Sequence, residues 1–161
     1  NGHDTLFLLD LINPNGKVYG FDLQRAAIES TRTNLQAAPN TENLVLIQAN
    51  HADLREHIPL PYHGNISAIM FNLGYLPSGD KSIITQAEST LAALTNAVDM
   101  LALNGIITIL AYPGHVGGDI ETDQVRDWCI RLDPSRFEAN LFENQPDNPS
   151  APKLFVINKM R

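Results

Sequence analysis

Cysteine is nearly absent from the chain, because Cys129 is the single thiol among 161 residues. One thiol forms neither an internal disulfide nor a cysteine-based zinc site, so the expected compartment is a reducing cytoplasm. Long apolar runs are scarce as well. The longest nearly apolar stretches, Leu6–Ile12 and Gly105–Tyr112, are too short to span a bilayer, so no membrane-spanning helix is expected in this chain.

Basic residues are also few. The chain has 11 Lys and Arg residues against 18 Asp and Glu residues, which gives a formal net charge of −7. A general polyanion binder carries a basic face, so this balance argues against that class of protein. It leaves open a local basic patch that recognises one folded RNA. The basic residues expected to gather at the rim of such a site are Arg25, Arg32, Lys81, Lys153, Lys159 and Arg161.

Metal-ligand spacing is missing too. Histidines that hold a metal recur at short, regular separations or beside cysteines. The five histidines of the chain do neither, so no metal site is expected. These histidines are His3, His51, His57, His63 and His115.

The chain does contain an ordinary globular composition, with 43% hydrophobic and 18% charged residues. Its length fits one domain, so residues 1–161 are expected to form a single domain with one core that includes Trp128 and Cys129. Apolar patterns of helix and strand period alternate along the chain. The expected helices are Thr5–Ile12, Gln24–Ala37, Ala52–His57, Ile84–Leu101 and Val125–Leu132. The expected strands are Lys17–Asp22, Leu44–Gln48, Ile66–Phe71, Gly105–Tyr112, Phe137–Leu141 and Leu154–Ile157.

This alternation predicts an α/β fold with a mostly parallel sheet that helices cover on both faces. The last two strands are joined by a short connection, which predicts a C-terminal antiparallel hairpin. The helix Ile84–Leu101 has the clearest periodicity. Thr85 and Glu88 fit a capping box at its start, and Asn104–Gly105 fits its end.

The start of the chain is a loop-to-helix junction, Asn1-Gly2-His3-Asp4-Thr5. A doubly wound sheet needs a strand before its first helix. We therefore expect a central parallel strand upstream of Asn1 that this chain lacks. The alternative is a natural start at this junction.

Two residues near the start are candidates for contacts to a nucleotide. Gly2 stands before a helix, where a turn lets a ligand approach the backbone closely, although a plain helix cap by Asp4 or Thr5 explains it equally well. Asp22 ends the first strand, where a carboxylate accepts the hydroxyls of a ribose; the alternative is a solvated turn residue. The spacing from Gly2 to Asp22 fits dinucleotide binders, but Thr5 stands where their third glycine belongs. A nicotinamide fingerprint is therefore poorly supported.

The loop Asn72–Ser82 follows a buried strand, at the carboxyl end where open α/β sheets bind ligands. It brings together a side-chain amide, an aromatic ring, an acid and a base. A loop without a function does not need Asn and Tyr directly after an apolar strand, so this loop is the strongest candidate site.

These residues carry a resemblance to a known family. The order Gly2, Asp22, strand, Asn72-x-x-Tyr75, with a closing hairpin, resembles class I S-adenosylmethionine-dependent methyltransferases, and Asn72-Leu73-Gly74-Tyr75 is similar to the Asn/Asp-Pro-Pro-Tyr motif of amino-group methyltransferases. The strings Phe71–Lys81 and Ala111–Glu121 resemble a narrower group, the small bacterial rRNA-methylase-like family, whose activity is tRNA 5-aminomethyl-2-thiouridine methyltransferase. The family's first strand and the Asp-Ala-Thr-type start of its Gly-rich loop are absent, and Ser78 stands at an expected glycine.

The resemblance implies a Rossmann-like sheet, S-adenosyl-L-methionine as cofactor, tRNA as substrate and methylation of the exocyclic amine of the modified wobble uridine; it leaves a homodimer open. Asn72 would orient the amine through its side-chain oxygen, and the Tyr75 ring would face the cationic centre. Asp80 or His115 would take the proton, although a structural hydrogen bond explains His115 nearly as well. Asp53 would face the adenine amine or cap a helix. The implied cofactor-binding residues are Asn1, Gly2, Asp4, Thr5, Asp22, Gln24, Asp53 and Asn72.

Other functions stay open from the residues alone. One is a methyltransferase that acts on rRNA or on a small-molecule amine. Another is a nicotinamide-dependent oxidoreductase, which Thr5 and the Asn72–Tyr75 motif disfavour. A third is a non-catalytic nucleotide-binding module, because the Gly-rich loop is incomplete.

Overall fold

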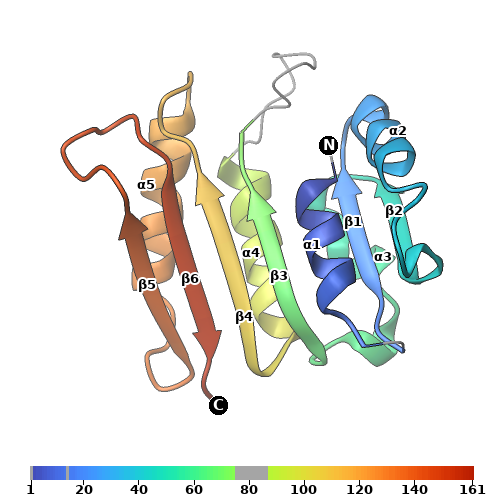
Figure 1. The fold of residues 1–161 in the computed structure, drawn as a ribbon. Helices are drawn as coiled ribbons and strands as arrows, with labels where there is room; N and C mark the ends of the chain where they lie inside the picture. The colour runs from blue at the N-terminus through green and yellow to red at the C-terminus, as the bar shows by residue number, and fades with distance from the viewer. Residues whose placement is uncertain (1, 14, 75–86) are drawn as a thin grey trace.

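The computed structural model describes residues 2–13, 15–74 and 87–161, and Figure 1 shows helices packed against strands. The helices are α1 (His3–Leu11), α2 (Arg25–Asn34), α3 (Leu54–His57), α4 (Ala87–Met100) and α5 (Gly118–Ile130). The strands are β1 (Val18–Asp22), β2 (Leu44–Gln48), β3 (Ile66–Asn72), β4 (Leu101–Ala111), β5 (Phe137–Glu143) and β6 (Lys153–Lys159). Short 3₁₀ helices lie at Thr41–Asn43, His51–Asp53 and Leu60–Tyr62.

The strands form two hydrogen-bonded groups. The pair β1–β2 is parallel, and the second group has the order β3-β4-β6-β5, in which β3–β4 is parallel while β4–β6 and β6–β5 are antiparallel. The α/β class, the parallel pairs and the closing antiparallel hairpin are therefore as the sequence predicts. Within the described ranges no strand joins β1 to β3. The strand expected before Asn1 would be the one to join them, and it stays a prediction.

The start of β4 differs from the sequence prediction. Strand β4 begins at Leu101, directly after α4, and not at Gly105. Asn104, with φ of 61°, and Gly105 lie inside the strand, where the β3–β4 register shifts between Ile66 and Ala68. The left-handed Asn104 and the glycine after it therefore mark a strand irregularity and not the expected helix end. Thr85, the proposed helix cap, lies outside the described residues.

One large core lies between the four-stranded group and the helices α4 and α5, which cover one face of it (Figure 1). Cys129 belongs to this core and Trp128 packs against it, as predicted. Burial raises the pKa of the Cys129 thiol to about 12, so this thiol is inert at neutral pH. The largest fully buried side chains of this core are Leu94, Met100, Leu101, Ile107, Ile109, Val125 and Ile157.

A second, smaller cluster supports β1 and β2. It consists of three buried side chains, Leu9, Val18 and Leu35, with partly buried neighbours around them. Helix α1 lies beside β1 and α2 beside β2 (Figure 1). In the part of the chain that the structure describes, no helix is long and apolar enough to cross a membrane.

The parallel strands β1, β2, β3 and β4 all point toward the same edge (Figure 1). Their carboxyl ends therefore lie along one side of the molecule. The residues that end or follow these strands are Asp22, the 3₁₀ turn His51–Asp53, Asn72 and Tyr112. This edge is where the predicted site residues are found.

Candidate active site at the carboxyl edge

Asn72 is the last residue of β3, and its side chain is exposed at the edge. The backbone N–H of Leu73 donates to the Leu110 carbonyl oxygen at 2.9 Å, so the end of β3 stays fixed against β4. The Asn72 side chain donates from Nδ2 to Asp4 Oδ2 at 3.4 Å. This contact joins two predicted site residues that are 68 positions apart in the chain.

The contact also corrects the sequence interpretation of α1. Asp4 and Thr5 are candidate helix caps in the sequence, but α1 has no side-chain hydrogen bond at its cap, which is Gly2. Helix α1 begins at His3, so Asp4 lies in its first turn, where its negative charge suits the helix dipole. Its carboxylate is therefore available to hold the Asn72 amide.

Tyr112 is a site residue that the sequence analysis does not single out. The Asn72 side-chain amide donates a hydrogen bond to the Tyr112 hydroxyl oxygen, which is the direction that lowers the pKa of a phenol. Burial and then the charge of Asp4 raise the pKa of Tyr112 above 10.0, while the hydrogen bond to Asn72 lowers it; burial is the largest effect. The phenol is therefore neutral at physiological pH. The available signal is its position directly after a strand at the same edge as Asn72.

His115 lies in the loop between β4 and α5, packed between two glycines. A Cβ on Gly74 would lie 3.4 Å from His115 Nε2, and one on Gly118 would lie 2.9 Å from the same atom. The structure therefore brings His115 next to the segment that starts at Asn72. Nδ1 lies 3.1 Å from the Val116 carbonyl oxygen, so the structural hydrogen bond is present as well.

Gly2 adopts the left-handed conformation, with φ of 79°, at the start of α1. A Cβ at this position would lie 3.0 Å from Thr31 Cγ2 on α2. The conformation and the close packing both require glycine. The backbone at the N-terminus of α1 therefore carries no side chain at Gly2, as expected for a turn that a ligand approaches closely.

Asp22 ends β1, and its Oδ1 accepts a hydrogen bond from the backbone N–H of Gln24 at 2.8 Å. This bond fixes the carboxylate at the carboxyl edge, beside the start of α2. Gln24 is the residue that precedes α2, and its side chain makes no cap bond. Both predicted residues therefore lie at the expected place.

Asp53 and His51 follow β2. Asp53 precedes α3 but makes no side-chain cap bond, so the helix-cap interpretation of Asp53 is wrong; Asn50 caps the 3₁₀ turn by accepting from Ala52 N–H at 2.9 Å. The His51 ring lies edge-on to Phe71 of β3, with 6.0 Å between centroids. Burial lowers the pKa of His51, and the nearby charges of Glu121, Asp22 and Asp53 offset this only in part. His51 is therefore neutral at pH 7 and lies between the two groups of strands.

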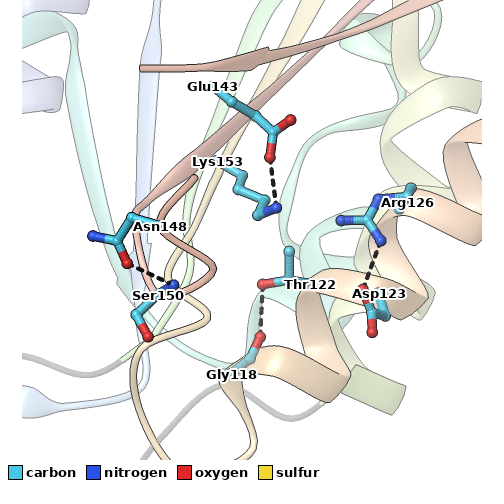
Figure 2. Close-up of polar contacts among 8 residues, drawn as sticks. All are labelled: Gly118, Thr122, Asp123, Arg126, Glu143, Asn148, Ser150 and Lys153. Atoms are coloured by element: carbon cyan, nitrogen blue, oxygen red, sulfur yellow. Dashed lines mark hydrogen bonds and ion pairs between the residues drawn. The ribbon is translucent and has the colours of Figure 1, made fainter. Parts of the chain in front are cut away.

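The basic residues predicted at the rim are divided between two edges. Lys153 starts β6 opposite Ala111, at the site edge, but it is paired with Glu143 at 2.6 Å (Figure 2). Lys159 donates to the Leu101 carbonyl oxygen at the start of β4, so it lies at the opposite edge, and the prediction for Lys159 is wrong. The reason is that β6 runs antiparallel to β4, so its carboxyl end lies at the edge opposite the site. Arg161 follows β6 by two residues and therefore also lies away from the site.

Several predicted residues lie outside the described residues, namely Asn1, Tyr75, Ser78, Asp80 and Lys81. Two surface hollows are found away from the edge. One of about 120 Å³ lies between α5 and the β5–β6 hairpin, and one of about 310 Å³ lies between α2 and β2. Over residues 2–13, 15–74 and 87–161, no group of three or more His, Cys, Asp or Glu side chains is placed to hold a metal ion.

The chain is similar to several known proteins. A family model described as "Putative rRNA methylase" matches residues 18–158. A "putative rRNA-methylase" from Clostridium thermocellum is 36% identical with a TM-score of 0.91, and the match covers 99% of this chain and 83% of that one. A "putative methyltransferase" from Streptococcus mutans, solved in complex with SAH, is 34% identical with a TM-score of 0.84 and the same two coverages.

A curated relative extends the comparison to a named activity. The chloroplastic tRNA (mnm(5)s(2)U34)-methyltransferase of Arabidopsis thaliana is 36% identical over 99% of this chain. The chain spans 60% of the length of that protein. The fold is that of a class I methyltransferase. The chain belongs to the family described as "Putative rRNA methylase".

Proposed function

We propose that the protein transfers a methyl group from S-adenosylmethionine to the exocyclic amine of 5-aminomethyl-2-thiouridine at the tRNA wobble position. The observation that carries this proposal is the cluster of Asn72, Asp4, Tyr112 and His115 beside the carboxyl ends of β3 and β4. Two similarities support it: the Arabidopsis relative is named for this modified uridine, and the Streptococcus neighbour binds SAH.

The residues at the ends of β1 and β2 fit the cofactor. The Asp22 carboxylate, fixed by the Gln24 N–H, would accept the ribose hydroxyls. The bare backbone at Gly2 would approach the amino-acid part, and Asp53 would face the adenine amine. S-adenosylmethionine supplies an electrophilic methyl group when bound. The protein's own task is to bring a neutral amine into line with it, because alignment supplies much of the rate of such a displacement.

Asn72 is placed to align the amine. Its Nδ2 faces Asp4, so its Oδ1 is the amide atom that accepts a hydrogen bond from the substrate N–H. Tyr112 and Asp4 hold the amide in this orientation. Transfer of the methyl group would release S-adenosylhomocysteine, and the methylated amine would then have to lose one proton.

His115 is placed to take that proton. A hydrogen bond from Nδ1–H to the Val116 carbonyl oxygen, at 3.1 Å, makes Nε2 the ring nitrogen that would accept a proton. Nε2 is also the ring atom next to Gly74, two residues beyond Asn72. Asp80, the other candidate base, lies outside the described residues.

The test is methyl transfer by the full-length protein to tRNA that carries 5-aminomethyl-2-thiouridine. Nucleoside mass spectrometry should find one added methyl group at the wobble position, and tRNA without the aminomethyl group should gain none. Binding of S-adenosylmethionine without transfer to this tRNA would overturn the substrate and favour rRNA or a small-molecule amine. Binding of a nicotinamide cofactor, and not of S-adenosylmethionine, would overturn the reaction itself.

Assembly and location are proposals as well. Strand β5 is an edge strand whose Leu141 and Phe142 are 38% and 55% exposed, and we propose that a second copy pairs along it. Light scattering on the full-length protein should give a dimer, and Phe142→Lys should give a monomer.

A cytoplasmic location stays a prediction from the single thiol; the name of the Arabidopsis relative places that protein in the chloroplast.

A further inference from the structure

Glu121 is a buried acid that the proposed chemistry does not use. It lies in the first turn of α5 and is 3% exposed. Burial of a carboxylate is unfavourable unless hydrogen bonds or charges compensate for it. Thr90 of α4, itself 0% exposed, donates its hydroxyl proton to Glu121 Oε1 at 2.6 Å. The N-terminal end of the α5 dipole adds a favourable field.

The charge of Glu121 also acts on the turn that follows β2. Of the three charged groups that act on His51, namely Glu121, Asp22 and Asp53, Glu121 has the largest effect. A second bond ties the same turn to α4, because Asn96 donates from Nδ2 to the Ala52 carbonyl oxygen at 3.0 Å. Asn96 therefore ties the turn to α4, and Thr90 ties α4 to Glu121 of α5.

Two of these elements connect to site residues, and α4 lies between them. The turn carries Asp53, and α5 follows the loop that carries His115. A shift of any of them moves one group of site residues relative to the others. Because alignment within a fraction of an ångström decides the rate of a displacement, a fixed contact among the three has a kinetic consequence.

We propose that Glu121 is a positioning residue of the methyl-transfer site, whose carboxylate holds α4 through Thr90, so that the turn after β2 and the loop after β4 keep their relative places. The kinetic part rests on the proposed function. The positioning part does not, because it is measured without turnover.

The test compares Glu121→Gln, Thr90→Val and Thr90→Ser in the full-length protein. Thr122→Val is the matched control, because the Thr122 hydroxyl is also buried and donates at 2.6 Å to the Gly118 carbonyl oxygen within α5 itself (Figure 2). Glu121→Gln and Thr90→Val should lower kcat at least tenfold while the Kd for S-adenosylmethionine changes less than threefold. Thr90→Ser should restore kcat, and Thr122→Val should keep it within twofold.

A second readout is the titration of the histidine ring protons by NMR. Glu121→Gln removes the negative charge that raises the pKa of His51, so this pKa should fall further, whereas Thr122→Val should leave it unchanged. Glu121→Gln should also shift the ring resonances of His115, which the control should not.

The outcomes separate the two proposals. One outcome is that Glu121→Gln and Thr90→Val keep kcat within twofold of the parent, while their melting temperatures fall as much as that of Thr122→Val. In that case Glu121 has only a structural role. If Glu121→Gln does not fold, the comparison of Thr90→Val with Thr90→Ser decides between the two roles. If the parent protein transfers no methyl group, the proposed function fails, and the His51 and His115 resonances alone confirm or overturn the positioning role.

Discussion

The two groups of strands differ in how firmly they are built. The four-stranded group shares one large core with α4 and α5, in which Leu94, Ile107 and Ile157 are 0% exposed. The β1–β2 pair rests on a cluster of three buried side chains, and the partly buried Tyr19 and Phe21 of β1 pack against the large core. The four-stranded group with α4 and α5, the firm half of the molecule, carries Asn72, Tyr112 and His115. The β1–β2 pair with α1 and α2, the smaller half, carries the groups assigned to the cofactor.

This difference indicates which part of the structure aligns the substrate amine in the proposed reaction. The groups proposed to orient the amine lie on the half with the larger buried core, which is expected to open least often. Side-chain contacts bridge the halves at the edge, among them Asn72 to Asp4 and the His51 ring to Phe71. We therefore expect substitutions in the firm half to change the rate, and substitutions in the smaller half to change cofactor affinity.

Gly118→Ala should lower the rate of methyl transfer most, because it disturbs the packing of the firm half at the loop that carries His115. A Cβ at Gly118 would collide with the Tyr112 carbonyl oxygen and lie 2.9 Å from the His115 ring. A backbone carbonyl cannot move aside without moving the loop. Overpacking of this kind costs about 1–3 kcal/mol, and single-turnover methyl transfer should fall by about a hundredfold or more.

Gly117→Ala is the adjacent control for that variant. Its Cβ would meet nothing within 4 Å, although its φ of 79° adds strain. It should lose stability of about 1 kcal/mol while its turnover stays near that of the parent. Equal loss of turnover in the two variants would show that strain, and not the collision with Tyr112 and His115, governs the loop.

Asn72→Ala should come next. It removes the amide that Asp4 and Tyr112 hold, and with it the acceptor proposed for the substrate amine. Loss of one orienting hydrogen bond lowers the rate by about a hundredfold, while cofactor affinity stays within threefold. Single-turnover transfer measures the rate, and calorimetry measures the affinity. Near-normal turnover in a folded variant would take Asn72 out of the active site.

Asp22→Ala should weaken cofactor binding by more than tenfold and leave the fold intact. Each hydrogen bond to a carboxylate contributes about 1.5–3 kcal/mol. The variant also loses the bond to the Gln24 N–H, so its melting temperature must be compared with the parent. Unchanged affinity by calorimetry would contradict the assignment of β1 to the cofactor.

The smallest expected effect is a pH dependence of the free energy of unfolding that comes from His51, at the contact between the two halves. Burial lowers the pKa of His51 below the 6.5 of the unfolded chain. As the pH falls below about 6.5, the unfolded state takes up the proton first, so the free energy of unfolding decreases. In urea unfolding between pH 7.5 and pH 5.5, the decrease should be smaller for His51→Asn than for the parent. An identical decrease in both proteins would remove His51 from this role.

The sequence predicts the six strands, the closing hairpin and the common edge, because each strand is a short apolar run between turn residues. It misplaces the start of β4, since an Asn-Gly pair is typical of a helix end and here lies within a strand. The position of Lys159 follows from the predicted hairpin, because an antiparallel strand ends at the opposite edge from its parallel neighbours.

Two site features depend on contacts that the sequence does not show. Tyr112 stands in the sequence as the end of an apolar strand, and its bond to Asn72 follows from the pairing of Asn72 with Leu110. Nothing in the sequence marks Glu121 as buried, because the predicted helix begins at Val125 and its partner Thr90 lies 31 positions away in another helix. Register and helix packing decide both, and neither is local in the chain.

The double variant Asp22→Ala/Asn72→Ala tests the division between the halves most directly. The measurement is the single-turnover rate of methyl transfer to tRNA as a function of S-adenosylmethionine concentration. The two sites act on separate steps, so their effects should add in free energy within about 0.5 kcal/mol. The double variant should then show the plateau of Asn72→Ala and the half-saturation of Asp22→Ala. A plateau that Asp22→Ala lowers as much as Asn72→Ala does would contradict the division.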